Sequence, residues 1–171
     1  MRWRELQNDI KPAIPYVFLF DDDGGQTFDS TGGFHTWDTT KIITQHFLYT
    51  TDTDSIFMQT NSAGLYEVTF ECTYSCITEC NIIAQVYKNG SVVNGSSVRH
   101  FCPSNKKISV SLTFTLYVER DDYIQIRSNT NDNSVTTVSD TSRLRIKFLP
   151  MQGWDNGTTA GRSQYTGKVN R

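Results

Sequence analysis

One stretch decides the fold: Gly64-Leu65-Tyr66-Glu67-Val68-Thr69-Phe70-Glu71-Cys72-Thr73-Tyr74. Its side chains alternate, so that every second residue from Tyr66 to Tyr74 is aromatic, aliphatic or cysteine, while Leu65 and four polar residues share the other face. A period of two with β-branched and aromatic residues predicts a long β-strand with one buried face. A helix is excluded, because a period of 3.6 would place the glutamates among the apolar side chains.

A second long strand is predicted over residues 108–120. Six apolar side chains alternate there with hydroxyl-bearing ones: Ile108, Val110, Leu112, Phe114, Leu116 and Val118 against Ser109, Ser111, Thr113, Thr115 and Tyr117. Residues 142–148 repeat the pattern with Leu144, Ile146 and Phe148 inward. Between two further β-like runs stands Asn89-Gly90, which predicts a hairpin with a type I′ turn because both residues accept positive φ.

The composition sets limits on the class of protein. The 171 residues suffice for one domain with a core, and 37% hydrophobic with only 20% charged residues fits an all-β protein rich in Ser and Thr. A net charge of −2 gives no general basic surface for nucleic acid, and no apolar run is long enough for membrane insertion. Glu5 and Asp9 separate the N-terminal positive charges from the apolar run at 13–20, and Pro15 interrupts that run. This pattern does not fit a secretory signal.

The four cysteines are Cys72, Cys76, Cys80 and Cys102. Their spacing does not match structural zinc motifs, although His100 near Cys102 leaves a Cys/His cluster in space open. Cys72 falls on the apolar strand face and is expected in the core. Cys76 and Cys80 flank a loop and can form a disulfide only in an oxidising setting. We expect no metal site.

No catalytic site is expected, and no cofactor. Nucleophile elbows, phosphate-cradling loops and cupin-type histidine motifs are absent from the sequence. Glu67 and Glu71 lie on one strand face about 13 Å apart, too far for paired acid–base work. The aspartates at 21–23 can bind a hard cation, but a solvated turn is the preferred interpretation. The sequons at Asn89, Asn94 and Asn156 are interpreted as turn chemistry.

The order of polar turn, Gly64-Leu65-Tyr66 and alternating strand resembles the centre of a C1q/TNF-like jelly roll. The likeness covers roughly residues 34–149 and includes the turn at Asn89-Gly90, whereas Asp121-Asp122 replaces the usual Gly-Asp turn. The resemblance implies an all-β, two-sheet antiparallel sandwich that forms a homotrimer. We expect an N-terminal arm (1–33), a jelly-roll domain (34–149) and a C-terminal tail (150–171).

The polar faces of the long strands are the expected trimer interface. If the family topology holds, they lie together on one sheet, with acidic residues on one strand and basic residues on another. The residues expected at the interface are Leu65, Glu67, Thr69, Thr113, Thr115, Tyr117, Arg145 and Lys147.

The chain has no collagen-like repeat, so the resemblance implies a virus or bacteriophage particle, assembled in the host cytoplasm. There the trimer would be a capsid decoration or fibre-head protein, and Arg2, Trp3 and Arg4 would anchor it to a capsid or other virion protein. One alternative is a secreted TNF/C1q-like receptor ligand. Another is a carbohydrate-binding fibre head that stacks a host-surface glycan on Trp37, Phe101 and Tyr123.

Overall fold

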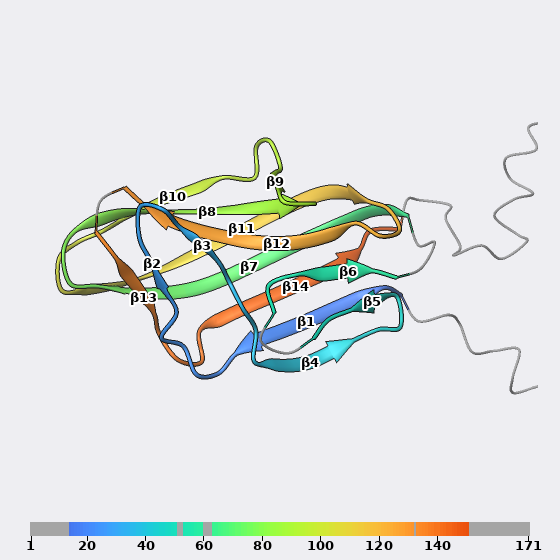
Figure 1. Ribbon diagram of the computed structural model, residues 1–171, viewed down its shortest axis with the longest axis horizontal. Coiled ribbons are helices and arrows are strands. Elements are labelled where there is room, and N and C mark those ends of the chain that lie inside the picture. The colour runs from blue at the N-terminus through green and yellow to red at the C-terminus, as the bar shows by residue number, and fades with distance from the viewer. Residues whose placement is uncertain (1–13, 51–52, 60–62, 132, 151–171) are drawn as a thin grey trace, which may run out of the picture.

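The computed structural model describes residues 14–50, 53–59, 63–131 and 133–150, which form two antiparallel β-sheets around one core (Figure 1). Sheet A contains β1 (Tyr16–Asp21), β2 (Thr27–Phe28), β4 (Thr39–Ile43), β7 (Gly64–Cys76), β11 (Lys106–Val118), β13 (Val135–Thr137) and β14 (Ser142–Phe148). Sheet B contains β3 (Gly33–Phe34), β5 (Phe47–Leu48), β6 (Ile56–Met58), β8 (Cys80–Lys88), β9 (Ser91–Val92), β10 (Val98–Cys102) and β12 (Tyr123–Thr130). The predicted all-β sandwich is confirmed.

Strand β7 is the centre of sheet A. It pairs with β11 over its whole length on one side, and with β14 and β13 on the other. The five side chains predicted to face the core, from Tyr66 to Tyr74, are at most 2% exposed. The apolar faces predicted for β11 and β14 also point inward. The main order of sheet A is therefore β11-β7-β14-β1-β4, while sheet B runs β10-β8-β12-β6-β5.

Gly64, the first residue of β7, makes room for an aromatic ring from β14. A Cβ at this position would lie 2.6 Å from Cε2 of Phe148. The Phe148 ring then packs edge-on against Tyr66, with 5.3 Å between centroids. The Gly-x-Tyr pattern thus lets the last strand seal the end of the core.

Strand β1 shows that the jelly-roll domain begins before residue 34, the start that the sequence predicted. This strand lies between β14 and β4 in sheet A, and its Val17 and Leu19 are fully buried. The alternation of Tyr16, Phe18 and Phe20 with these aliphatic residues is a strand signal, although the sequence alone left open whether residues 16–20 form a short strand or an anchoring segment. Residues 14–33 therefore belong to the sandwich. The rest of the arm, including Arg2, Trp3 and Arg4, and residues 151–171 of the tail lie outside the described residues.

Trp37, one of the aromatic residues considered for sugar stacking, is a core residue. Its side chain is fully buried, stacks on His35 with 5.9 Å between ring centroids, and contacts Phe70 edge-on. Phe101 and Tyr123 lie near opposite ends of β8, beside Asn81 and Asn89 respectively. The structure therefore does not gather the three aromatic residues proposed for sugar stacking.

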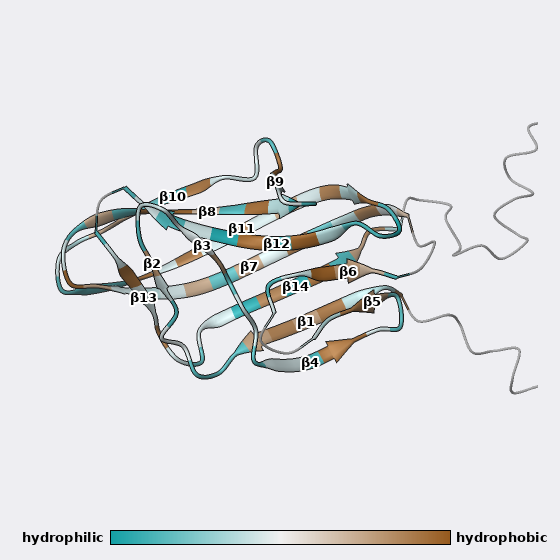
Figure 2. Ribbon diagram, in the orientation of Figure 1, coloured by the Kyte–Doolittle hydropathy of each residue, from teal (hydrophilic) through white to brown (hydrophobic). Residues whose placement is uncertain are grey.

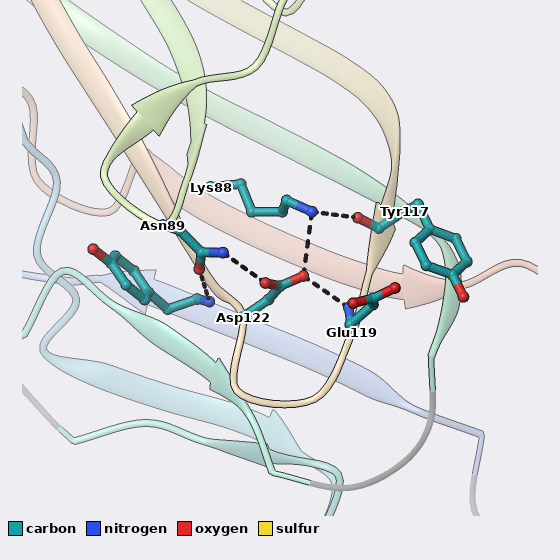
Figure 3. A network of polar contacts seen from close by, with 6 residues as sticks. Lys88, Asn89, Tyr117, Glu119 and Asp122 are labelled. Atoms are coloured by element: carbon teal, nitrogen blue, oxygen red, sulfur yellow. Dashed lines mark hydrogen bonds and ion pairs between the residues drawn. The ribbon is translucent and has the colours of Figure 1, made fainter.

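Two turns meet at the end of the molecule where β11 passes into β12 (Figure 3). Asn89 and Gly90 have φ values of 53° and 75°, as the type I′ prediction requires. The Asp122 carboxylate accepts hydrogen bonds from Asn89 Nδ2 at 2.6 Å, Glu119 N at 2.8 Å and Lys88 Nζ at 3.2 Å. Burial raises the pKa of Asp122, but these donors outweigh it and hold the pKa below its ordinary value.

The aspartates at 21–23 form a hydrogen-bonded turn. Asp21 accepts bonds from Gly24 N at 3.2 Å and Gln26 Nε2 at 2.6 Å. The backbone N–H groups of Asp22 and Asp23 are held by the Asp38 carboxylate at 2.9 and 3.0 Å. Within the described ranges no three His, Cys, Asp or Glu side chains are grouped so that they can hold a metal ion.

We predict that His35 makes the fold sensitive to acid. Its ring is fully buried, with Nε2 3.0 Å from Tyr74 Oη and 2.8 Å from Ser128 Oγ, and burial lowers the pKa of His35 from 6.5 to about 3. Below pH 6.5, His35 binds a proton in the unfolded chain but stays neutral in the folded chain until the pH approaches about 3. The free energy of unfolding should therefore fall by up to roughly 1.4 kcal/mol per pH unit between these values.

Urea unfolding of wild type and His35→Gln across this range measures the effect. Glutamine does not titrate, so the variant should lose stability less steeply as the pH falls. His100→Gln, on β10, is the matched control and should retain the wild-type slope. Equal slopes for wild type and His35→Gln would contradict the assignment.

Candidate functional site: the outer face of sheet A

The face of sheet A that points away from the core carries a banded pattern of side chains. Strand pairing places these residues side by side in three rows: Tyr16, Lys147, Glu67 and Thr115; Phe18, Arg145, Thr69 and Thr113; Phe20, Arg143, Glu71 and Ser111. The outward side chains of each strand are therefore of one or two chemical kinds. Strand β1 is aromatic, β14 basic, β7 acidic and hydroxylic, and β11 hydroxylic. We call this surface the banded face.

The structure brings together all eight residues predicted for the trimer interface. Leu65 and Tyr117 are cross-strand partners at one end of the banded face, where they are 38% and 50% exposed. The other six lie in the first two rows. Figure 2 shows hydrophobic and hydrophilic residues interspersed along these strands. Their placement on one face agrees with the sequence pattern, while their role as an interface stays a prediction.

The aromatic band of β1 was missed from the sequence. Arg145 lies over the ring of Phe18 at 4.9 Å from its centroid, and Arg143 lies over Phe20 at 5.3 Å. Lys41 of β4 also lies over Phe20, at 5.3 Å. Such cation–π contacts fix long side chains that would otherwise be mobile. The period of two over residues 16–20 was the signal that could have found this band.

Charge on the banded face is only partly satisfied within one subunit. Glu67 and Glu71 stand opposite Lys147 and Arg143 in the strand register. In the described part of the chain the ion pairs within 4.0 Å are Lys88–Asp122 and Arg120–Asp121, so neither glutamate forms one. Arg143 Nε is buried without a hydrogen-bond partner.

A depression of about 300 Å³ opens on the banded face beside Arg143. It is lined by Glu71, Cys72, Thr73, Ser109, Val110, Ser111, Asp140, Thr141 and Arg143. Carboxylates, hydroxyls and a guanidinium can all form hydrogen bonds with a polar group inserted there. The banded face as a whole therefore combines stacked cations, carboxylates that form no ion pair with the described residues, and a border of hydroxyl side chains on β11.

The cysteine pairing differs from the sequence expectation. Cys76, at the end of β7, is bonded to Cys102 of β10 and not to Cys80, the partner that the sequence had left open. Strand β10 was not predicted, and it is this strand that carries Cys102 to the end of β7. Cys72 is a free thiol 2% exposed, which confirms it as a core residue. Cys80 is also free and buried.

Comparisons with known proteins give a fold. No family model matches the chain, and no curated protein matches its sequence. The crystal structure of murine APRIL at pH 5.0 superposes with a TM-score of 0.58 at 10% identity, over 80% of this chain and 100% of that chain. The structure of murine APRIL at pH 8.0 gives 0.57 at 12% identity with the same coverage.

The chain has a TNF-like jelly-roll fold. The resemblance noted in the sequence is thereby confirmed at the level of fold. The comparisons do not support membership of a viral group. None of the described segments is a helix long and apolar enough to cross a bilayer.

We predict that loss of the disulfide destabilises the fold. The bond joins residues 26 apart and restrains the unfolded chain, so Cys102→Ser should lower the free energy of unfolding by roughly 3 kcal/mol. Cys80→Ser leaves the bond in place and serves as the control, with a change of less than about 1 kcal/mol. Urea unfolding with and without reductant measures both. A Cys102→Ser variant as stable as the oxidised wild type would contradict the pairing.

Proposed function

We propose that this chain is a homotrimeric binding module of the TNF/C1q type, in which the banded face forms the contact between subunits. The observation that carries the proposal is the chemistry of that face. It holds Arg143 and Arg145 stacked on aromatic rings, two glutamates that form no ion pair with the described residues, and the exposed pair Leu65 and Tyr117. An ordinary solvated sheet face has no need of fixed cations beside exposed apolar side chains.

A closed ring of three copies requires each subunit to present two different surfaces that fit each other. Strand β11 supplies a second surface, because among the described strands it pairs only with β7 and so forms an edge of sheet A. Its outward side chains from Ser109 to Thr115 are small hydroxyls, which let another subunit approach closely. The TNF-like fold is compatible with the same assembly, because the C1q/TNF-like resemblance of the sequence implies a homotrimer.

The disulfide favours a setting outside the cytosol. Bonds such as Cys76–Cys102 persist in extracellular spaces and on virion surfaces, and are rare in reducing compartments. Strands β1 and β14 are antiparallel neighbours, so the chain enters at Tyr16 and leaves at Lys147 from the same end (Figure 1). The loops around the disulfide lie at the other end. A receptor-type protein partner bound at those loops is the role that we favour.

Attachment to a virus or phage particle is the second candidate. The shared exit of the two chain ends favours it, because an anchor at that end would leave the disulfide-linked loops facing outward. It rests otherwise on the sequence resemblance, and its expected anchor of Arg2, Trp3 and Arg4 lies outside the described residues. A glycan partner loses support with the burial of Trp37.

We predict that the purified chain is a trimer and that Arg145→Glu weakens it. Light scattering after size exclusion should give three times the 19.5 kDa chain mass at micromolar concentration. The Arg145→Glu reversal removes the stacking on Phe18 and repels the neighbouring acidic band, so the dissociation constant should rise at least about tenfold.

Arg120→Glu is the matched control, because Arg120 is exposed in the turn after β11, away from the three rows. It should remain a trimer, and both variants should keep the wild-type β-sheet spectrum. A wild-type chain that is monomeric at micromolar concentration would end the trimer proposal. A trimer unaffected by Arg145→Glu would move the interface to another face.

The two settings are separated by a truncation. Deletion of residues 1–13 leaves every described strand intact, so the trimer should persist. If the chain decorates a particle through Arg2, Trp3 and Arg4, co-sedimentation with the particle should be lost in this variant. Co-sedimentation that survives the deletion would exclude the arm as the anchor.

A further inference from the structure

Three of the four cysteines meet at the loop end of the sandwich. Cys76 and Cys102 are bonded to each other, and the free thiol of Cys80 lies 4.0 Å from the sulfur of Cys76. Cys80 is also the direct cross-strand partner of Cys102 in the pairing of β8 with β10. A free thiol thus lies beside both partners of a disulfide, and neither the fold nor the proposed trimer requires it.

We propose that this cluster is a site of internal thiol–disulfide exchange, in which Cys80 replaces Cys102 as the partner of Cys76. Cys80 loses its proton, and its thiolate attacks Cys76 Sγ to form the Cys76–Cys80 bond. The Cys76–Cys102 bond breaks, its electron pair goes to Cys102 Sγ, and that sulfur takes up a proton. One disulfide and one thiol are present before and after, so no oxidant or reductant is consumed.

Backbone contacts hold the reacting groups together. Asn105 N donates to Ile77 O at 3.1 Å, and Glu79 N donates to Ser104 Oγ at 3.1 Å. These bonds fasten the β10–β11 turn to the β7–β8 turn without help from the disulfide. Cys80 stays beside Cys76 in either bonding state, because only the three residues 77–79 separate them.

Burial makes the exchange internal to one chain. Cys76, Cys80 and Cys102 are at most 2% exposed, which excludes most outside thiols. The remaining cysteine, Cys72, also lies on β7, before Cys76, and its sulfur is 3.2 Å from Ser142 Oγ. Burial also raises the pKa of the Cys80 thiol, so exchange should be slow near neutrality and faster in alkaline solution.

The two bonding states differ in what they join. The Cys76–Cys102 bond ties β7 of sheet A to β10 of sheet B. A Cys76–Cys80 bond would close only the turn between β7 and β8. Exchange would therefore release the β10–β11 turn from its covalent tie and leave it held by hydrogen bonds. The loop end would become looser while the banded face stays intact.

Peptide mapping tests the proposal directly. The full chain is kept at about pH 6 or about pH 9, and then blocked with N-ethylmaleimide in denaturant at mildly acidic pH before trypsin digestion. Cleavage after Lys and Arg puts Cys72, Cys76 and Cys80 on the peptide 42–88 and Cys102 on the peptide 100–106. The two peptides are linked before exchange. After exchange the peptide 100–106 is free and carries the label on Cys102.

We expect the labelled free peptide to increase with time, faster at the higher pH, at a rate independent of protein concentration. Cys80→Ser should show only the linked peptides, whereas the matched variant Cys72→Ser should exchange like the wild type. Permanent linkage in the wild type at the higher pH would overturn the proposal. A rate that rises with protein concentration would also overturn it, because the exchange would then be between molecules.

Discussion

The hydrogen-bonded pairing of β7 along both of its edges is the constraint on which the rest of the structure depends. Thirteen consecutive register pairs join it to β11, and β14 and β13 complete its other edge. In such a ladder each side chain has a fixed side, so a slip of one residue would exchange the core face for the outer face. Phe70 is fully buried and its neighbour Glu71 lines the banded face, so such a slip would exchange their environments.

The same ladder connects the core to the candidate interface. Burial of Tyr66 and Tyr74 specifies the register, and that register places Glu67 between Lys147 and Thr115. The outer face contributes less to stability than the core does, because its charged side chains are only partly buried. Its Arg and Glu side chains are free to be chosen for contact with another molecule. The fold does not determine which residues occupy these positions, so their side chains can be selected for binding.

The long strands were predictable because alternation over eleven or more residues has few alternative interpretations. The Asn89-Gly90 turn was predictable because its backbone demands positive φ. Strand β10 was not, since its five residues mix Arg99 and His100 with apolar neighbours, and its pairing with β8 depends on tertiary context. The partner of Cys76 in the disulfide could not be predicted for the same reason. Sequence spacing favoured Cys80, while only the folded chain shows that Cys102 reaches Cys76.

The two ends of the sandwich are held by different means, and this difference bears on how the module can work. At the chain-exit end, Asp122 and Asn89 join two turns through hydrogen bonds, which break and reform quickly. At the loop end, a covalent bond joins the two sheets. A binding surface made of loops loses less entropy on binding when those loops are already restrained. A covalent tie at the loop end is therefore compatible with the proposal that a partner binds at these loops.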